Sequence, residues 1–350
     1  MWILWRVRNK IEKENKKSEN VISKNGKVIE SKRDKLKRIQ KANRKITVRV
    51  FCALTFLNLW IYVPKLSNEI INFMESALSV EESGLNTDRI LEVTFLDVGQ
   101  GDGIFLKTYN GINIMIDGGS LSVDDAAKYR IVPFLKYKGI SRIDYVFVTH
   151  ADYDHISGIV EMLKNSNVNG IKIKNLILPD IRLKDENYQS LIETALRNNI
   201  KVLYIMSGKV LQFGDVKFKC IYPNITDSAE DRNDYSTVLS VKYNKFSMLL
   251  TGDISEKVEN KIKDKVESHY TILKVAHHGS KYSTTEKFLS WINPDYSVIS
   301  VGENNLYGHP HKELLKRLEK SGSSVLRTDK SGGITIKSEG ESMVIEKSIE

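Results

Sequence analysis

The chain has 350 residues, enough for one domain of about 250 residues and an additional segment. Its net charge of +9 comes from the first 50 residues, which hold 17 Lys/Arg against 5 Asp/Glu, whereas the rest holds 36 basic and 39 acidic residues. The larger part therefore lacks the basic surplus typical of nucleic-acid-binding domains. The two cysteines, Cys52 and Cys220, exclude a disulfide framework and a Cys-x-x-Cys metal motif.

The first 89 residues differ in composition from the rest of the chain. Residues 1–45 are rich in Lys, Glu, Asn and Ser and bury too little apolar surface to offset the entropy of ordering, so we expect a disordered basic tail. Residues 46–64 contain the uncharged run 50–63, which is shorter than the roughly 20 residues of a full membrane span. Residues 65–89 are expected to be a linker.

The apolar segment 46–64 is nevertheless expected to be a signal anchor or a transmembrane helix. Arg49 can extend its side chain to the interface, and Trp60 and Tyr62 are of the type enriched there. Because basic residues precede the segment, the positive-inside tendency predicts a single-pass protein of the cell membrane with residues 90–350 outside the cytoplasm. Cleavage of the segment and secretion of the rest is the alternative.

Residues 90–350 read as one domain of mixed β and α structure. Strands are expected at 90–96, 103–108, 112–116, 145–148, 176–178, 202–205, 216–221, 238–243, 246–250, 271–275, 296–301, 333–337 and 342–345, and helices at 124–137, 156–164, 188–197, 286–291 and 312–320. The strands fall into two blocks, which suits two packed sheets flanked by helices.

One short stretch concentrates possible metal ligands. Directly after the apolar run 145–148 the sequence reads His150-Ala151-Asp152-Tyr153-Asp154-His155. Imidazole and carboxylate groups at the end of a buried strand are costly unless a partner compensates them, and a divalent cation is the natural one. A solvated turn with incidental acids is the alternative.

Several further motifs occur in a fixed order. They are Asp97-Val98-Gly99-Gln100-Gly101-Asp102, Asp117-Gly118-Gly119, Thr251-Gly252-Asp253, Ala276-His277-His278-Gly279-Ser280 and Gly308-His309-Pro310-His311. Together with the stretch at His150 they resemble the metallo-β-lactamase superfamily, and within it the hydrolase domain of ComEC-type competence (DNA-uptake) proteins. The resemblance runs from about Leu91 to about Lys337 and implies the α/β (α+β) four-layer αββα fold.

The resemblance also implies a site for two divalent metal ions, Zn²⁺ or Mn²⁺. Its metal ligands would be His150, Asp152, Asp154, His155, Asp253 and His309, with Asp253 bridging the two ions. Asp154, His277 and His278 would take part in catalysis, and Asp97, Gln100, Asp102, Asp117, Asn233, Ser236 and His311 would support the ligands or contact the substrate.

The chain also departs from the superfamily pattern. Asp152 stands where many relatives have His, and Asn233-x-x-Ser236 replaces another His, so the site is richer in oxygen and favours Mn²⁺ more than its relatives do. His277 and His278 are adjacent, and in an extended backbone their side chains would diverge, so only one is expected to face the metals. The sequence leaves open which one.

The chemistry implied is metal-assisted hydrolysis of a phosphodiester. The leading expectation is a membrane-anchored DNase acting at the cell surface, as the ComEC-type resemblance implies. A phosphodiesterase acting on phosphorylcholine, a wall polymer or a small nucleotide is the alternative. A non-catalytic, metal-bearing partner of a DNA-uptake channel is a third possibility.

Overall fold

The computed structural model describes residues 89–165, 169–182, 184–229 and 231–349. The expected basic tail (1–45), the apolar segment (46–64) and all but the last residue of the linker (65–89) lie outside these residues. Across the described parts of the chain, no helix combines the length and the apolar character that crossing a bilayer requires.

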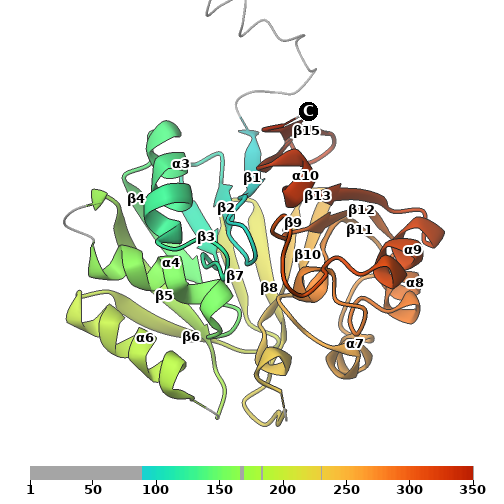
Figure 1. Ribbon diagram of the computed structural model, residues 1–350, viewed down its shortest axis with the longest axis horizontal. Helices are drawn as coiled ribbons and strands as arrows, with labels where there is room; N and C mark the ends of the chain where they lie inside the picture. Colours follow the sequence, from blue (N-terminus) through green and yellow to red (C-terminus); the bar gives the residue numbers. More distant parts are fainter. Residues whose placement is uncertain (1–88, 166–168, 183, 230, 350) are drawn as a thin grey trace, which may run out of the picture. The chain divides into compact units, whose positions relative to one another are not determined.

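Two β-sheets form the centre of the domain (Figure 1). The first has the order β15 (Met343–Lys347), β14 (Ile334–Ser338), β1 (Leu91–Phe95), β2 (Ile104–Lys107), β3 (Asn113–Ile116), β4 (Arg142–Phe147), β5 (Lys172–Pro179) and β6 (Lys201–Ile205). The second has the order β13 (Ser324–Arg327), β12 (Pro294–Ile299), β11 (Tyr270–Lys274), β10 (Phe246–Leu250), β9 (Val238–Tyr243), β8 (Val216–Tyr222) and β7 (Val210–Phe213). In both sheets a parallel run, β3 to β6 and β10 to β13, adjoins antiparallel strands.

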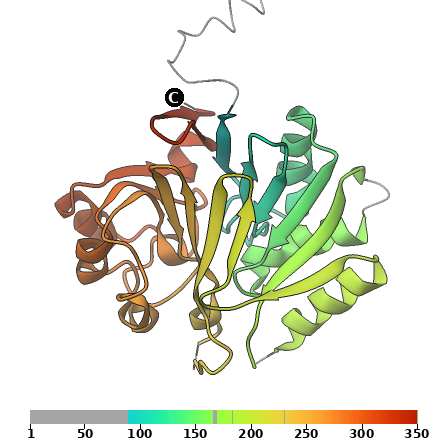
Figure 2. The ribbon, with the colours of Figure 1, turned by 180° about the vertical axis from the view of Figure 1, so that it is seen from behind.

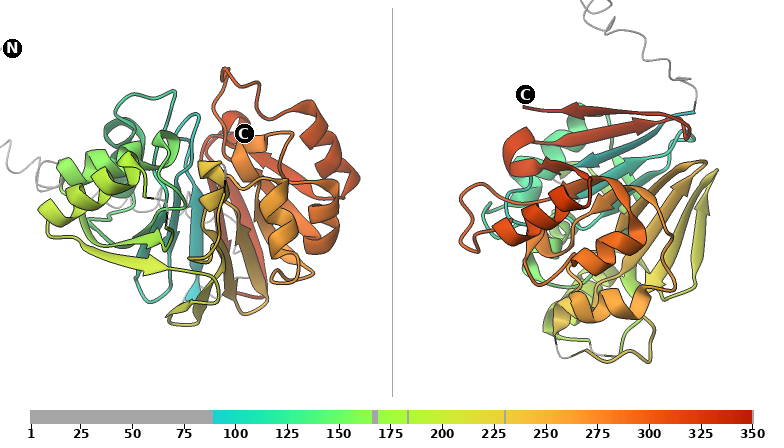
Figure 3. Two further views of the ribbon diagram at one scale, coloured as in Figure 1. Left: turned by 90° about the horizontal axis from the view of Figure 1, so that it is seen from below. Right: turned by 90° about the vertical axis from the view of Figure 1, so that its right-hand side faces the viewer.

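Helices cover the outer face of each sheet (Figures 1 and 3). The first sheet carries α3 (Val132–Tyr137), α4 (Tyr153–Lys164) and α6 (Glu186–Arg197), and the second carries α7 (Glu256–Ile262), α8 (Glu286–Ile292) and α9 (Lys312–Lys320). Seen from behind, β7 to β10 of the second sheet lie in the middle of the view (Figure 2). The predicted four-layer αββα fold is therefore confirmed.

Three clusters of buried apolar side chains, one between the sheets and one under the helices of each sheet, hold the fold together. Along β10, Phe246, Met248 and Leu250 are buried between the two sheets, whereas Leu249 packs under the helices of the second sheet. This alternation follows from the two-residue period of a strand. Phe147 and Phe218 stack across the space between the sheets, with ring centroids 5.6 Å apart.

The elements agree with the sequence-based expectations with a few exceptions. The helix expected at 124–137 is a π-helical turn (Ala127–Ile131) that continues directly into α3, whose first turn contains Pro133. Four elements were not expected from the sequence: β7, α7, β13 and the one-turn helix α10 (Thr328–Ser331). These elements have four to seven residues and few buried side chains, so they carry little periodic signal.

Candidate metal centre

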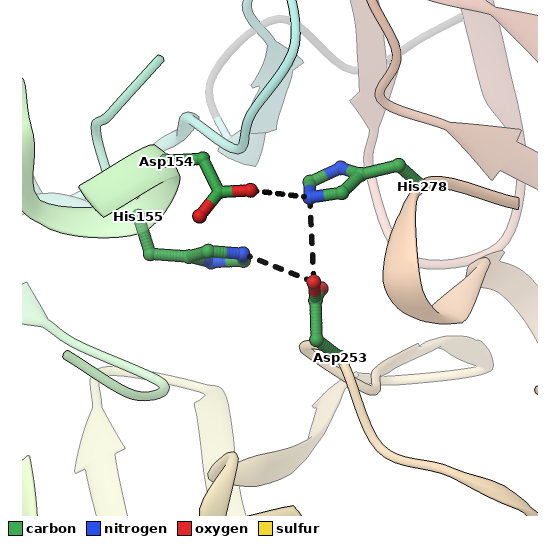
Figure 4. Close-up of side chains that lie close together, drawn as sticks. All are labelled: Asp154, His155, Asp253 and His278. Atoms are coloured by element: carbon green, nitrogen blue, oxygen red, sulfur yellow. Dashed lines mark ion pairs between the residues drawn. The ribbon is translucent and has the colours of Figure 1, made fainter. Parts of the chain in front are cut away.

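Four side chains converge where elements of the two sheets meet (Figure 4): Asp154, His155, Asp253 and His278. Asp253 Oδ2 lies 3.4 Å from His155 Nε2 and 3.3 Å from His278 Nε2. His278 Nε2 also lies 3.3 Å from Asp154 Oδ2. One carboxylate oxygen, Oδ2 of Asp253, is therefore the point on which both rings converge.

Asp154 and His155 are placed by the start of α4, which follows β4 after a short loop. The Asp154 carbonyl accepts a hydrogen bond from the Asp102 N–H (3.1 Å), and the His155 carbonyl accepts one from the Gly118 N–H (2.8 Å). A Cβ atom at Gly119 would lie 2.5 Å from the Tyr153 carbonyl oxygen, so this close approach requires glycine. The loop after β3 thus fixes the first turn of α4.

Asp253 is placed by a tight turn at the end of β10. Gly252 has φ +52°, and a Cβ atom there would lie 2.7 Å from Ser236 Cβ. The Asp253 N–H donates to Ser236 Oγ at 3.1 Å. The glycine therefore allows the turn to pack against Ser236, which orients the carboxylate.

The backbone at His277 and His278 is not extended, contrary to the expectation for this pair. Both residues are left-handed, with φ +52°, in a short 3₁₀ segment (Ala276–Gly279) after β11. The His278 side chain is 2% exposed and points into the cluster, whereas the His277 side chain is 35% exposed, with Nε2 4.0 Å from Asp253 Oδ2. The adjacent rings do point differently, and His278 is the one that enters the cluster.

Each ring of the cluster has one nitrogen engaged and the other free for a cation. His155 Nδ1 lies 2.8 Å from Asp117 Oδ2, and His278 Nδ1 lies 3.0 Å from the Ser300 carbonyl oxygen, which can only accept. Among the described residues, neither Nε2 has a hydrogen-bond partner of good geometry, although both are buried. Such engaged Nδ1 atoms and orphaned Nε2 atoms fit a metal site.

The metal-free cluster is strongly polarised. Burial opposes ionisation of Asp253, but His278, His155 and Lys274 outweigh it and hold the pKa of this carboxyl well below its usual range. Burial likewise opposes charge on His278, but Asp253 and Asp102 raise its pKa to about 10. Asp154 keeps a pKa of about 2 despite its burial, because His278 and His155 favour its ionised form. The carboxylates of Asp253 and Asp154 thus favour a positive charge at this point of the site.

His150 and Asp152 lie beside this cluster. The ring of His150 lies 4.1 Å from that of His155, between centroids, and its Nε2 lies 3.9 Å from Asp152 Oδ2. Burial and the neighbouring His155 hold the pKa of His150 well below its usual range, so the ring is neutral and able to bind a metal. Asp152 also faces Arg232, with 3.6 Å between Oδ1 and Nε. The pair adjoins the four-residue cluster without belonging to it.

His309 and His311 lie at the rim. The ring of His309 lies 5.8 Å from that of His277 and 4.8 Å from that of His311. Burial and the charges of His278 and His277 lower the pKa of His309 to about 4. His311 Nδ1 accepts a hydrogen bond from the Lys281 N–H at 3.3 Å. The structure thus does not bring His309 into the four-residue cluster, and its role as a ligand stays a prediction.

The residues expected to support the ligands fall into two groups. Asp117 contacts His155 and accepts hydrogen bonds from the Thr149 N–H (2.8 Å) and hydroxyl (2.7 Å), and Asp102 lies 3.6 Å from His278 Nδ1. Asp97 instead accepts a hydrogen bond from the Gly99 N–H at 3.1 Å and lies 3.6 Å from Arg130.

Gln100, Asn233 and Ser236 contact backbone groups near the site, and Ser236 also contacts the ring of His150. Gln100 Oε1 accepts from the Gly302 N–H at 3.2 Å and so joins loops 202 residues apart. Ser236 Oγ lies 3.2 Å from His150 Nδ1, in addition to its bond from the Asp253 N–H. The Asn233 carbonyl accepts from the Ser236 N–H and closes the turn that holds this serine.

Three residues that hold the site together were not expected from the sequence. Thr149 links Asp117 to the ring of His150, and the Ser300 carbonyl fixes His278. Lys274 is fully buried at the end of β11 and contacts Asp102 and Asp253. A lysine inside the apolar run 271–275 was the one available signal, since a buried cation needs an anionic partner.

The fold and the candidate site together indicate the class of protein to which the chain belongs. Carboxylates and imidazoles without a thiolate, set at the junction of two sheets in an αββα domain, form a candidate centre for Zn²⁺, Mn²⁺ or a similar ion. Residues 96–303 match the sequence model of the "Metallo-beta-lactamase superfamily". The chain belongs to this superfamily, most members of which are metal-dependent hydrolases.

Relatives narrow the resemblance to competence proteins. ComE operon protein 3 of Bacillus subtilis (strain 168) is 33% identical over 257 residues, which is 69% of this chain and 32% of that protein. Competence protein ComA of Neisseria gonorrhoeae is 30% identical over 244 residues, which is 69% of this chain and 31% of that protein. The chain thus spans about a third of these relatives. The crystal structure of the metallo-beta-lactamase fold protein YhfI from Bacillus subtilis matches with a TM-score of 0.49 and 10% identity, over 71% of this chain and 100% of that one.

Proposed function

We propose that this protein is a membrane-anchored, dinuclear-metal hydrolase of phosphodiesters, acting as a DNase at the cell surface. The observation that carries the metal chemistry is the convergence of His155 and His278 on a single oxygen of Asp253 with both Nε2 atoms free. The relatives named for competence support DNA as the substrate and a DNA-uptake channel as the partner.

In this proposal the metal ions, Asp154 and His277 have different roles in hydrolysis. Two divalent ions held there would lower the pKa of a water molecule toward neutrality and offset the charge developing on the phosphate. Asp154, ionised because of its low pKa, would accept a hydrogen bond from the attacking water and orient it. His277, partly exposed at the rim, would donate a proton to the leaving oxygen.

A second candidate substrate class is suggested by the charge of the domain. Residues after the first 50 hold 36 basic and 39 acidic residues, whereas a DNA-binding surface normally carries a basic surplus. Phosphorylcholine, a wall polymer or a small nucleotide is the alternative phosphodiester. These substrates need less basic surface than DNA does.

The test measures cleavage of two substrates by the same preparation of the protein. The full chain, purified in detergent and loaded with Mn²⁺ or Zn²⁺, is assayed on single-stranded DNA and on bis-p-nitrophenyl phosphate, with Asp154→Ala as the inactive control. We expect cleavage of both substrates by the wild-type protein. Cleavage of neither refutes the phosphodiesterase proposal, and cleavage of the small ester alone shifts the assignment to the alternative substrates.

The metal preference is tested at Asp152. This carboxylate offers a hard oxygen where imidazole is common among relatives, so we propose Mn²⁺ as the preferred activator. Asp152→His should move the ratio of Mn²⁺- to Zn²⁺-supported activity toward Zn²⁺. An unchanged ratio would refute the role of Asp152 in metal choice.

The membrane anchor is tested by topology. We propose that residues 46–64 hold the protein in the membrane with the catalytic domain outside, because the basic residues precede this segment. A C-terminal alkaline phosphatase fusion should be active in cells, and a cytoplasmic reporter at the same point should be inactive. The reverse pattern would overturn the proposed location.

A further inference from the structure

Lys274 is a buried cation next to the candidate metal centre. It is 1% exposed, and its Nζ contacts Asp102 Oδ2, lies 3.5 Å from Asp253 Oδ1 and donates to the Gly252 carbonyl oxygen at 3.0 Å. An ammonium group is buried in this way only when its charge is compensated. Its partners come from the loop after β1 and from the turn after β10.

The contacts divide the two oxygens of Asp253 between two tasks. Oδ1 faces Lys274, whereas Oδ2 faces the rings of His155 and His278. Lys274 also holds the carbonyl of Gly252, so the backbone and the side chain of this turn share one anchor. With Oδ1 engaged by the ammonium, Oδ2 is the oxygen left for a cation.

Lys274 also accounts for the second group of acids near His155. Asp102, Asp117 and His155 lie close enough together to suggest a further metal site. However, Asp102 already pairs with Lys274, and Asp117 is bonded to Thr149 and His155. Asp102 Oδ2 and both oxygens of Asp117 therefore already have partners within the chain.

We propose that Lys274 is a positioning residue for metal binding: its ammonium turns Asp253 so that Oδ2 faces the metal centre, and keeps Asp102 and Asp253 together before a metal arrives. A simpler role is only to neutralise Asp102. The two roles differ in what happens when Asp102 is neutralised by substitution. Neutralisation restores stability in both cases, whereas metal affinity stays reduced only if Lys274 orients Asp253.

The experiment uses four variants of the full chain: Lys274→Met, Asp102→Asn, the double variant, and Lys138→Met as a control that removes a partly buried pair with Glu92 away from the site. Thermal unfolding is followed in EDTA, and Mn²⁺ and Zn²⁺ affinities are measured by titration of the metal-free proteins. No activity measurement is needed. The inference rests on the metal-binding part of the proposed function, and the wild-type titration tests that part separately.

We expect Lys274→Met to lower the Tm in EDTA by roughly 10 °C, because it removes the ammonium partner of the buried Asp102 and one of the partners of Asp253. The double variant should recover most of this loss yet bind metal about 10- to 100-fold more weakly than Asp102→Asn alone, the usual cost of losing a residue that orients a ligand. Lys138→Met should keep wild-type metal affinity.

Three results would overturn the inference. The first is equal metal affinity of the double variant and Asp102→Asn, and the second is wild-type metal affinity of Lys274→Met. The third is failure of the double variant to fold while Asp102→Asn folds, which would assign Lys274 to folding in general. A wild-type protein that binds no metal would instead refute the proposed function.

Discussion

Replacing Asp253 by Asn tests the geometry of the metal centre most directly. The substitution keeps the shape of the side chain and removes its negative charge from the point where His155 and His278 converge. A carboxylate about 4 Å from a positive charge contributes about 4 kcal/mol per unit of that charge at an effective dielectric constant near 20. Since about 1.4 kcal/mol corresponds to a factor of ten, we expect at least a roughly 10³-fold loss of metal affinity.

The measurement is a titration of the metal-free protein with Zn²⁺ and Mn²⁺, together with metal analysis after dialysis. Asp295→Asn is the matched control, because Asp295 also pairs with a histidine, His269, at 3.1 Å, but both side chains are about half exposed. We expect the control to bind as the wild type does. Stoichiometric, wild-type affinity of Asp253→Asn would show that this carboxylate does not bridge the metals.

Three further predictions concern the rim, the pH dependence of metal binding and the core. His277→Ala should keep its metal and lose about 10²–10⁴-fold in rate, whereas His278→Ala should lose metal in the same analysis, because only His278 points into the cluster. Metal affinity should rise at least about tenfold per pH unit between pH 6.5 and 8.5, because the pKa of His278 is raised to about 10 in the metal-free protein and its proton must leave before a cation binds. Burial opposes charge on His155, but Asp253 and Asp117 raise its pKa as well, so loss of its proton would steepen the dependence. Titrations showing no pH dependence would contradict this. Burial raises the pKa of the Cys220 thiol to about 12, so in a Cys52→Ser background it should resist a thiol reagent at pH 8 until the protein unfolds. The pKa of Cys220 in the folded protein is above the unfolded value of about 8.5. Its contribution to the free energy of unfolding is therefore fully present below that pH and is lost as the pH rises toward 12. Denaturant melts at pH 8 and pH 10 would detect this loss.

Much of the fold could be predicted from the sequence because its strands and helices carry regular apolar patterns. The run 238–250, for example, reads as two strands joined by a short turn, and the structure has β9 and β10 there. The motifs indicated the family, because several of them agree in order. Neither the apolar patterns nor the order of the motifs depends on how the loops contact one another in the folded protein.

The details of the site could not be predicted because they depend on contacts between distant loops. The left-handed backbone at His277 and His278 gives no local signal, since histidine seldom adopts it without support from its surroundings. The burial of Lys274 likewise depends on Asp102, which lies far away in sequence. Short elements such as β13 were missed because tertiary packing, and not local preference, places them.

The centre draws its side chains from both halves of the chain: Asp154 and His155 follow β4 of the first sheet, whereas Asp253 and His278 follow β10 and β11 of the second. A growing chain therefore has no complete centre until residues past His278 have folded against the first sheet. If this candidate centre binds a cation, as we propose, capture of the cation would be a late step of folding and would join the two halves across their interface. Because proteins select metals largely by availability, the proposed ion would be set by the compartment in which the second sheet folds.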